Sequence, residues 1–206
     1  MALGTIFLTS CGFFNDSIKK AFMNELPRNF THLKIGIITT ASEQKEKNPF
    51  AIKAFNDFME MGFTQIIFMD IKKEQVNLED FSIIYLNGGN PFRLLYFIKL
   101  NNLEEAFTQF CKKETFLIGV SAGAIILGPT LQLVHDFTPQ LNTYLKQELT
   151  GLSITDSCIF PHYDRSDLFG TSPTIEQRIQ TFEKQYNKAV IRLKDEDFRI
   201  EKIKEA

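Results

Sequence analysis

Short apolar runs alternate along this chain with longer stretches in which apolar residues recur every three or four positions. Most of the runs are rich in Ile and Phe and carry apolar residues at consecutive positions, which is typical of parallel strands covered on both faces. They occupy residues 5–10, 34–40, 64–70, 81–89, 115–123 and 189–193. The alternation predicts an α/β fold in which helices sandwich a doubly wound, mostly parallel sheet.

Helical periodicity fills several of the intervening stretches, at 51–59, 103–110 and 175–186. In each of them apolar residues share one face, as in an amphipathic helix that packs on a sheet. We expect Gly62 to end the first helix and Pro91 to begin a further one, because these residue types favour those positions. No linker, repeat or low-complexity segment interrupts the pattern, so we expect one domain over residues 1–206.

Charge and hydropathy indicate which kinds of partner, nucleic acids or membranes, can be expected. The chain has 206 residues, with 23 Lys and Arg against 25 Asp and Glu, and a net charge of −2. This balance gives no reason to expect a nucleic acid or an anionic membrane as partner. No stretch approaches the roughly 18 apolar residues of a membrane span, and no Lys or Arg precedes the short apolar segment that ends at Cys11. We therefore expect a soluble, cytoplasmic protein without a signal sequence.

Metal and disulfide chemistry are not indicated either. The cysteines show no C-x-x-C pairing and the histidines no H-x-x-x-H spacing. The residues concerned are Cys11, Cys111 and Cys158, and His32, His135 and His162. We expect free thiols in a reducing compartment, and neither a metal nor a cofactor.

Ser121 stands in the segment that carries the clearest chemical signal. Residues 119–123 read Gly-Val-Ser-Ala-Gly and directly follow an apolar run, which fits the G-x-S-x-G pattern of a nucleophile on a sharp strand-to-helix turn. The helix that follows would offer unpaired N–H groups and a positive dipole end to an oxyanion. By position alone, however, Ser121 is equally well explained as a small residue that starts a helix.

A serine nucleophile needs a general base, and His162 is the best-placed histidine. It follows the apolar "CIF" and Pro161, so it should emerge at the carboxyl end of a strand, where α/β folds collect their chemistry. The carboxylate that would orient the imidazole stays open between Asp136, which precedes the histidine, and Asp195, which follows the last predicted strand. Asp164 is too close to His162 along the chain, and we expect it to cap the loop or to pair with Arg165.

The segment Gly88-Gly89-Asn90 follows another predicted strand. A glycine pair in this position can turn backbone N–H groups toward a shared point, as an oxyanion hole requires. A nucleotide-binding loop is the alternative, but neither G-x-G-x-x-G nor G-x-x-x-x-G-K-[ST] is present.

Taken together, these segments resemble the dipeptidase E (α-aspartyl dipeptidase) family of serine peptidases, relatives of cyanophycinase. The resemblance runs in order through "YLNGGNPFRLL", "GVSAGA", "HDF", "FPHYD" and "TIEQRI". It implies a fold related to the class I glutamine amidotransferases, with serine in place of cysteine at the elbow. It also implies that Ser121 is the nucleophile, that His162 is the base, and that the N–H groups of Gly89 and Ala122 hold the oxyanion. Asp136 matches the acidic position usually assigned to the charge relay, and Asp195 is the structural alternative.

One departure from the family pattern concerns the substrate. Aspartyl-specific members carry a T-R-E-Q-R-like helix start whose arginine is thought to bind the substrate's aspartate, whereas residues 174–178 here read Thr-Ile-Glu-Gln-Arg. Ile175 cannot make that bidentate contact, so we expect a relaxed or apolar preference at this subsite. Arg165 and Arg178 are the candidates to replace the arginine, and Ile175, Arg178 and Asn90 are the candidate substrate-binding residues.

The sequence therefore favours a serine peptidase that hydrolyses small peptides through an acyl-enzyme on Ser121, without strict specificity for an N-terminal Asp. We expect a small peptide as its partner and a monomer or homodimer as its assembly. Two alternatives stay open. A small α/β esterase shares G-x-S-x-G and the order Ser, Asp, His, and a catalytically idle binding module could retain the elbow as a feature of the fold.

Overall fold

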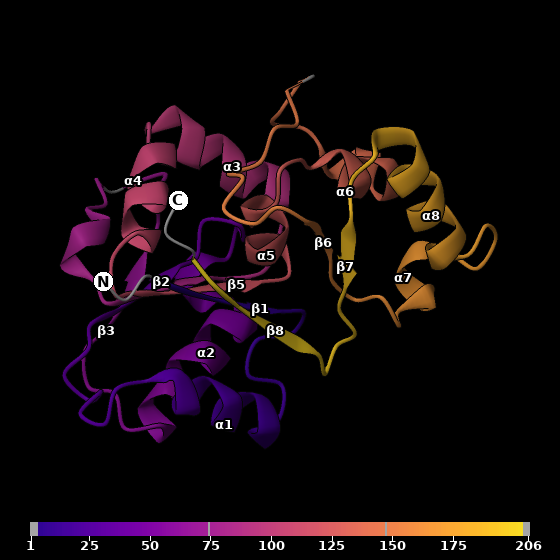
Figure 1. The fold of residues 1–206 in the computed structure, drawn as a ribbon. Helices are drawn as coiled ribbons and strands as arrows, with labels where there is room; N and C mark the ends of the chain where they lie inside the picture. Colours follow the sequence, from indigo (N-terminus) through magenta and orange to yellow (C-terminus); the bar gives the residue numbers. More distant parts are fainter. Residues whose placement is uncertain (1–3, 74, 147, 204–206) are drawn as a thin grey trace.

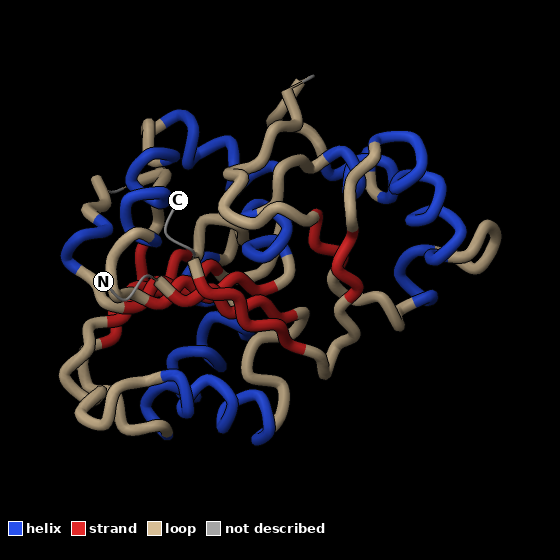
Figure 2. The backbone as a smooth tube through the Cα atoms, viewed as in Figure 1, coloured by secondary structure: helices blue, strands red, loops and turns tan. Residues whose placement is uncertain are grey.

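In the computed structural model, which describes residues 4–73, 75–146 and 148–203, a six-stranded sheet runs through the middle of the molecule (Figures 1 and 2). Its strands, in spatial order, are β3 (Ile66–Met69), β2 (Ile35–Ile38), β4 (Ile83–Leu86), β5 (Phe116–Val120), β1 (Thr5–Thr9) and β8 (Phe198–Lys202). Neighbouring strands from β3 to β1 are parallel, and β8 runs antiparallel to β1. The predicted α/β fold with a mostly parallel sheet is confirmed.

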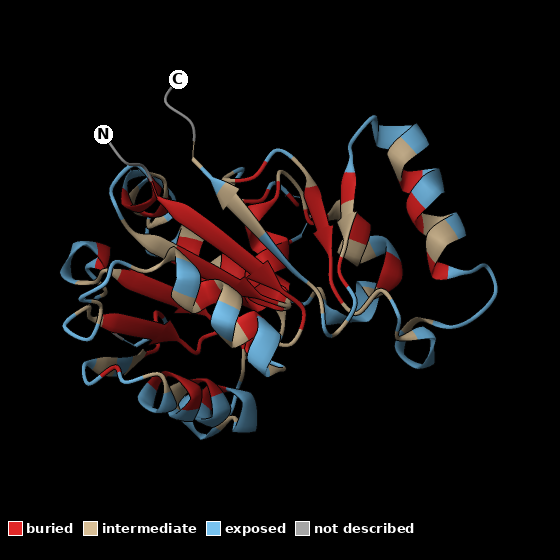
Figure 3. Ribbon diagram, turned by 60° about the horizontal axis from the view of Figure 1, so that its bottom comes forward, coloured by how far each residue is buried: buried red, intermediate tan, exposed pale blue. Residues whose placement is uncertain are grey.

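Strand residues alternate between two buried layers, one on each face of the sheet. In β1, Phe7 faces a cluster that includes Phe22 and Phe58, whereas Leu8 faces a cluster that includes Leu86 and Ile125. Helices α1 (Asp16–Glu25) and α2 (Pro49–Glu60) cover the first face, and α3 (Pro91–Leu100), α4 (Glu104–Cys111) and α5 (Ala122–Leu127) cover the second (Figure 1). Because both faces are covered, β1, β2 and β4 are buried along their whole length (Figure 3), which explains their continuous apolar runs.

A third buried cluster lies beside the main sheet, at the right of Figure 1. It contains a parallel pair of short strands, β6 (Cys158–Phe160) and β7 (Val190–Arg192), together with α6 (Gln132–Phe137), α7 (Ser166–Phe169) and α8 (Ile175–Tyr186). The apolar run at 189–193 therefore forms a strand of this small sheet and not of the main one. Three further 3₁₀ turns occur among the described residues, at Lys45–Lys47, Leu78–Asp80 and Pro139–Leu141.

Local sequence fixes where several helices begin. Asn48 and Asn90 accept hydrogen bonds from the first N–H groups of α2 and α3, and a proline follows each of them as the first helical residue. Helix α8 begins with a capping box in which Thr174 and Gln177 bond each other's backbone. These caps satisfy N–H groups that have no partner within the helix. The expected start at Pro91 is confirmed.

None of the helices in the described part of the chain is long and apolar enough to cross a bilayer.

Candidate active site

Ser121 lies on a sharp turn between β5 and α5. Its backbone has φ 48° and ψ −109°, a conformation that L residues rarely adopt and that costs on the order of 1–3 kcal/mol. The turn is held because the Ser121 N–H donates to the Thr9 carbonyl at the end of the neighbouring strand. Gly123 lets α5 pack closely on β4, since a Cβ at this position would lie 2.3 Å from the Leu86 carbonyl oxygen. The G-x-S-x-G segment therefore forms the predicted elbow.

His162 meets this serine from the end of β6. Its Nε2 lies 2.9 Å from the Ser121 Oγ, a hydrogen-bond distance at which the imidazole can accept the hydroxyl proton. The backbone of His162 has φ 58°, and its N–H donates to the Ser10 hydroxyl, which in turn donates to the Leu193 carbonyl. Residues after β1 and β7 therefore fix the histidine in an uncommon backbone conformation.

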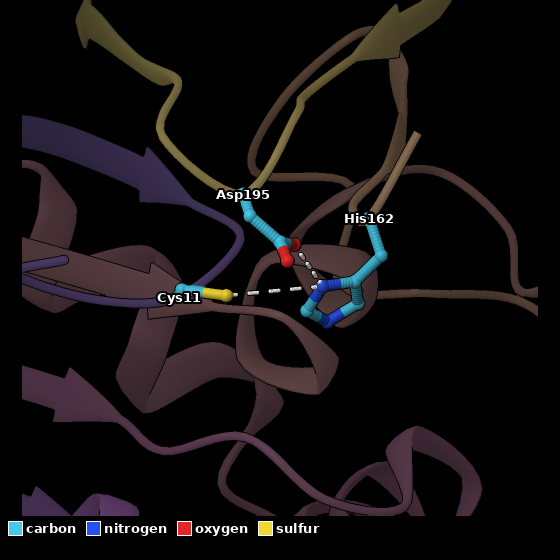
Figure 4. Close-up of side chains that lie close together, drawn as sticks. All are labelled: Cys11, His162 and Asp195. Carbon is cyan, nitrogen blue, oxygen red and sulfur yellow. Dashed lines mark hydrogen bonds and ion pairs between the residues drawn. The ribbon is translucent and has the colours of Figure 1, made fainter. Parts of the chain in front are cut away.

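Asp195, in the loop between β7 and β8, supports the other side of the imidazole (Figure 4). Its Oδ1 lies 2.6 Å from His162 Nδ1, and its Oδ2 accepts a hydrogen bond of 3.2 Å from Arg165. Burial by itself would raise the pKa of the Asp195 carboxyl, but the hydrogen bonds from His162 and Arg165 outweigh burial and hold this pKa below its ordinary value. An ionised Asp195 accepts a hydrogen bond from the His162 Nδ1–H, which leaves Nε2 free to accept a hydrogen bond from the Ser121 hydroxyl.

The structure corrects the sequence-based assignment of Asp136 as the orienting carboxylate. Asp136 is an exposed residue of α6, and its Oδ1 accepts a hydrogen bond from Gln132 one turn earlier in the same helix. Asp195 makes the contact expected of Asp136, because the loop after β7 brings its carboxylate to the imidazole, whereas Asp136 lies on the exposed side of α6. Asp164 accepts the Asp195 N–H, so it acts in the loop, as expected, and does not contact the imidazole.

Cys11 lies on the same side of the imidazole, with its Sγ 3.9 Å from His162 Nδ1 (Figure 4). Burial, followed by the negative charge of Asp195, raises the pKa of the Cys11 thiol to about 12, so the thiol stays protonated at neutral pH and is a poor nucleophile. The ligand atoms of Cys11, His162 and Asp195 lie within 4.8 Å of one another, as metal ligands could. The 2.6 Å contact between His162 and Asp195 is nevertheless a hydrogen bond, because two ligands of a tetrahedral zinc ion, each ~2.0 Å from the metal, lie roughly 3.3 Å apart.

Backbone N–H groups of the glycine loop and the elbow lie beside the serine. A Cβ on Gly88 would lie 3.4 Å from the Ser121 Cβ. Gly89 has φ 144°, and a Cβ there would meet the Ala41 carbonyl oxygen at 2.5 Å, so this position requires glycine. Within the described residues, neither the Gly89 N–H nor the Ala122 N–H, at the start of α5, donates to a protein acceptor. Both groups are available to an oxyanion on a substrate held at Ser121.

A cavity of about 600 Å³ opens beside Ser121 and His162. Its walls come from the loop after β1, from α2 and its cap, from the glycine loop after β4, and from the loops that carry His162 and Asp195. Its lining includes Phe13, Phe14, Phe50, Lys53, Asp57 and Arg165. This volume falls within the ~300–1,000 Å³ typical of small-molecule sites.

The three residues expected to bind the substrate do not line this cavity. Ile175 is 7% exposed and packs in the third cluster, because it starts the apolar stripe of α8. Arg178 donates to the carbonyls of Phe169 and Asp136, and its guanidinium stacks on the Phe137 ring. Asn90 caps α3 and donates to the Leu141 carbonyl. All three side chains have structural partners, so the structure gives no support to these predictions.

Sequence reasoning missed the side of the site formed by α2 and by the loop after β1. Phe13 and Phe14 follow β1, whose carboxyl end lies at the same sheet edge as Ser121, so strand order could have pointed to them. Lys53 carried no such signal, since it occupies an ordinary polar position of an amphipathic helix, whereas Asp57 is a carboxylate among the buried residues of α2.

Comparisons with known proteins agree with this architecture. The model of peptidase family S51 matches residues 6–200, and the chain therefore belongs to this family, the family of dipeptidase E. The resemblance seen in the sequence is confirmed, and membership of a peptidase family makes the chain a hydrolase of peptide bonds.

Individual relatives are similar over most of their length. The chain is 26% identical to an uncharacterized peptidase of Listeria innocua over 77% of this chain and 76% of the relative. It is 27% identical to an uncharacterized peptidase of Pasteurella multocida over 66% of this chain and 67% of the relative. Among solved structures, a protein described as a candidate peptidase E from Listeria monocytogenes EGD-e superposes with a TM-score of 0.76 at 20% identity, covering 99% of this chain and 96% of the other. A peptidase from an acI-B1 actinobacterium superposes with a TM-score of 0.66 at 16% identity, covering 97% and 84%.

Proposed function

We propose that this protein is a serine peptidase that hydrolyses small peptides through an acyl-enzyme on Ser121. The observation that carries the proposal is the unbroken chain of contacts Ser121 Oγ–His162 Nε2, at 2.9 Å, and His162 Nδ1–Asp195 Oδ1, at 2.6 Å. Serine, imidazole and carboxylate in this sequence of contacts form the arrangement that activates a hydroxyl for acyl transfer.

In the proposed reaction, the Ser121 Oγ attacks the peptide carbonyl while His162 Nε2 takes the hydroxyl proton. The N–H groups of Gly89 and Ala122 stabilise the oxyanion, and His162 then gives the proton to the departing amine as the C–N bond breaks. Water, activated by the same imidazole, hydrolyses the resulting ester and restores the serine. Asp195 keeps the imidazole in the tautomer that accepts at Nε2 and stabilises the imidazolium as it forms.

The cavity supports small substrates. It is bounded by α2, by the loop after β1 and by the loops that carry the triad, and a volume of about 600 Å³ suits a short peptide better than a folded protein segment. Position 175 carries isoleucine and not arginine, and Ile175 is buried away from the cavity. Strict selection of an N-terminal Asp is therefore not part of the proposal. Three free cysteines fit action in the cytoplasm, which we propose as the location.

The test combines active-site labelling with peptide cleavage. Wild type and Ser121→Ala would be treated with a fluorophosphonate and assayed for amine release from Asp-Xaa, Leu-Xaa and Met-Xaa dipeptides and tripeptides. We expect one label, on Ser121, and both labelling and cleavage lost in the variant. Ser17→Ala is the matched control, because Ser17 lies exposed on α1. Cleavage retained in Ser121→Ala would contradict the mechanism, and ester hydrolysis without peptide cleavage would point to an esterase.

A further inference from the structure

One wall of the cavity beside Ser121 is strongly apolar. Phe13, Tyr85, Val120 and Ala54 form its buried part. Phe14 and Phe50, from the loop after β1 and from the first turn of α2, are 53% and 67% exposed, although both line the cavity. Large exposed aromatic side chains at a cavity are a feature of sites that bury them against a ligand. A substrate group that fills this space is therefore apolar and preferably aromatic.

The ammonium group of Lys53 also lines this largely apolar cavity. The Lys53 ammonium donates to the Asp57 carboxylate at 2.6 Å and to the Phe13 carbonyl at 2.9 Å. An ammonium has three N–H donors, and its partners among the described residues use two of them. The Lys53 side chain is 48% exposed, so its remaining donor is accessible to a ligand in the cavity.

The local balance of charge leaves Lys53 able to bind an anion. Asp57 is also paired with Lys19, at 2.8 Å, so two ammonium groups share this one buried carboxylate. The second carboxylate of the cluster, Glu60, is 67% exposed, contacts Lys19 and does not line the cavity. The other cation of the lining, Arg165, is occupied by Asp167 and Asp195. Lys53 is thus the cation of the cavity wall best placed to receive an anionic group of the substrate.

We propose that this cavity binds the C-terminal residue of a short peptide, with an aromatic or large aliphatic side chain against Phe13, Phe14 and Phe50 and the free carboxylate on Lys53. This inference rests on the proposed function and names its substrate class. An acidic side chain would also supply a carboxylate, but it would not fill the apolar wall. A C-terminal residue brings both groups on a single Cα. Hydrolysis of the preceding peptide bond then releases this residue as a free amino acid.

The test compares Ala-Phe, Ala-Phe amide and Ala-Ala as substrates of wild type and Lys53→Met, which keeps most of the length of the unbranched side chain and removes its charge. For wild type we expect Ala-Phe to be preferred over both other peptides. In Lys53→Met the KM for Ala-Phe should rise roughly tenfold with little change in kcat, the KM for the amide should not change, and Lys53→Arg should restore most of the loss. Lys20→Met is the matched control, because Lys20 lies exposed on α1 and does not line the cavity.

Phe14→Ala tests the aromatic wall separately and carries little risk to folding, since this side chain is already 53% exposed. It should reduce the preference for Ala-Phe over Ala-Ala. Equal KM values of wild type and Lys53→Met for Ala-Phe would overturn the proposal. It would also be overturned if wild type cleaved Ala-Phe and its amide equally well. The same holds if Lys53→Met changed only the preference for Asp-Ala over Asn-Ala, because Lys53 would then bind an acidic side chain and not the C-terminal carboxylate.

Two readouts separate this inference from the proposed function. Fluorophosphonate labelling of Ser121 should proceed at the same rate in Lys53→Met as in wild type, which shows that the triad is intact. In calorimetric titrations, phenylalanine should bind and phenylalaninamide, which lacks the carboxylate, should not. The same result is expected for Ser121→Ala. Binding of phenylalanine without any labelling or cleavage would keep the subsite and reject the peptidase. Labelling and cleavage without a role for Lys53 would do the reverse.

Discussion

Two aspartates were candidates for the same task, and they differ in what they touch. Asp195 Oδ1 contacts His162 Nδ1 at 2.6 Å, whereas Asp136 contacts Gln132 on an exposed helix face. Asp195→Asn should keep the geometry but favour the wrong imidazole tautomer, so we expect kcat to fall by about 10³–10⁴-fold. Asp136→Asn should stay within about twofold of wild type, since its contact is with an exposed side chain. Steady-state kinetics of the two variants on the same peptide checks this, and equal losses would contradict the assignment.

At the same scale, the sequence predicts those site residues whose position can be recognised from their immediate neighbours in the chain. Ser121 and His162 were predicted because a turn pattern and a strand end are visible in a few neighbouring letters. The choice between Asp136 and Asp195 depends on which loop passes the histidine, and that is a property of tertiary packing. Ile175 was placed at a subsite although its spacing with Ile179 and Phe182 already marked it as part of a buried helix face. Lys53 carried no sequence signal at all.

At the scale of elements, Arg192 of β7 joins this strand to α8. Its guanidinium donates to both Glu176 and Glu183, one turn and three turns into that helix. These hydrogen bonds from Arg192 are the largest cause that lowers the pKa of each glutamate below its ordinary value. All three side chains are partly exposed, so we expect Arg192→Leu to reduce the free energy of unfolding by only about 1 kcal/mol at pH 7.

The pH dependence of this difference has a definite sign. A carboxyl whose pKa is lower in the folded state stabilises the fold above its unfolded pKa, about 4.3 for Glu, and loses that contribution as pH falls through the folded value. Urea unfolding should therefore show a constant gap between wild type and Arg192→Leu near neutral pH, and the gap should narrow below about pH 4.3. Arg199→Leu is the control. It removes the ion pair between Arg199, which is 53% exposed, and Glu201, so it should reduce the free energy of unfolding by less. A gap that widens in acid would contradict this account.

Strands were predictable from sequence where they form a continuous apolar run, and this holds even for the edge strand β3, in which Ile67 is 43% exposed. The five parallel strands of the main sheet were found because each is a continuous apolar run. Strand β8 was missed, since it lies at the sheet edge with exposed and half-buried residues and reads as a charged segment. The small sheet of β6 and β7 could not be told from the main one, because periodicity gives the type of an element and not its partner.

At the scale of the whole molecule, the site forms because the parallel strands end at one edge of the sheet. The loop after β1 brings Cys11 and Phe13, the turn after β4 brings Gly89, and the turn after β5 brings Ser121. His162 and Asp195 come from the neighbouring small sheet, in the loops that follow β6 and β7. The nucleophile therefore follows a strand of the main sheet and its base a strand of the small sheet, and their 2.9 Å contact depends on how the buried clusters of the two sheets pack against each other.

The connection between the clusters is built from backbone hydrogen bonds. The segment that precedes β6 is tied to the end of α5, since the N–H groups of Leu152, Ile154 and Thr155 donate to the carbonyls of Ile126 and Leu127. A Cβ on Gly151 would lie 2.1 Å from the Gly128 carbonyl oxygen, so the two segments lie in direct contact. We propose that residues 1–206 form a single domain and expect them to unfold in one step.

Hydrogen exchange monitored by mass spectrometry across a urea gradient tests this expectation. Peptides that cover β2 in the main sheet and α8 in the third cluster should lose protection at the same urea concentration, and activity should disappear there too. Gly151→Val, which forces a side chain into the junction, should lower the midpoint for both peptides together. If α8 lost protection well before β2, the third cluster would be an independent unit. The triad would then break at the His162–Ser121 contact before the main sheet unfolds.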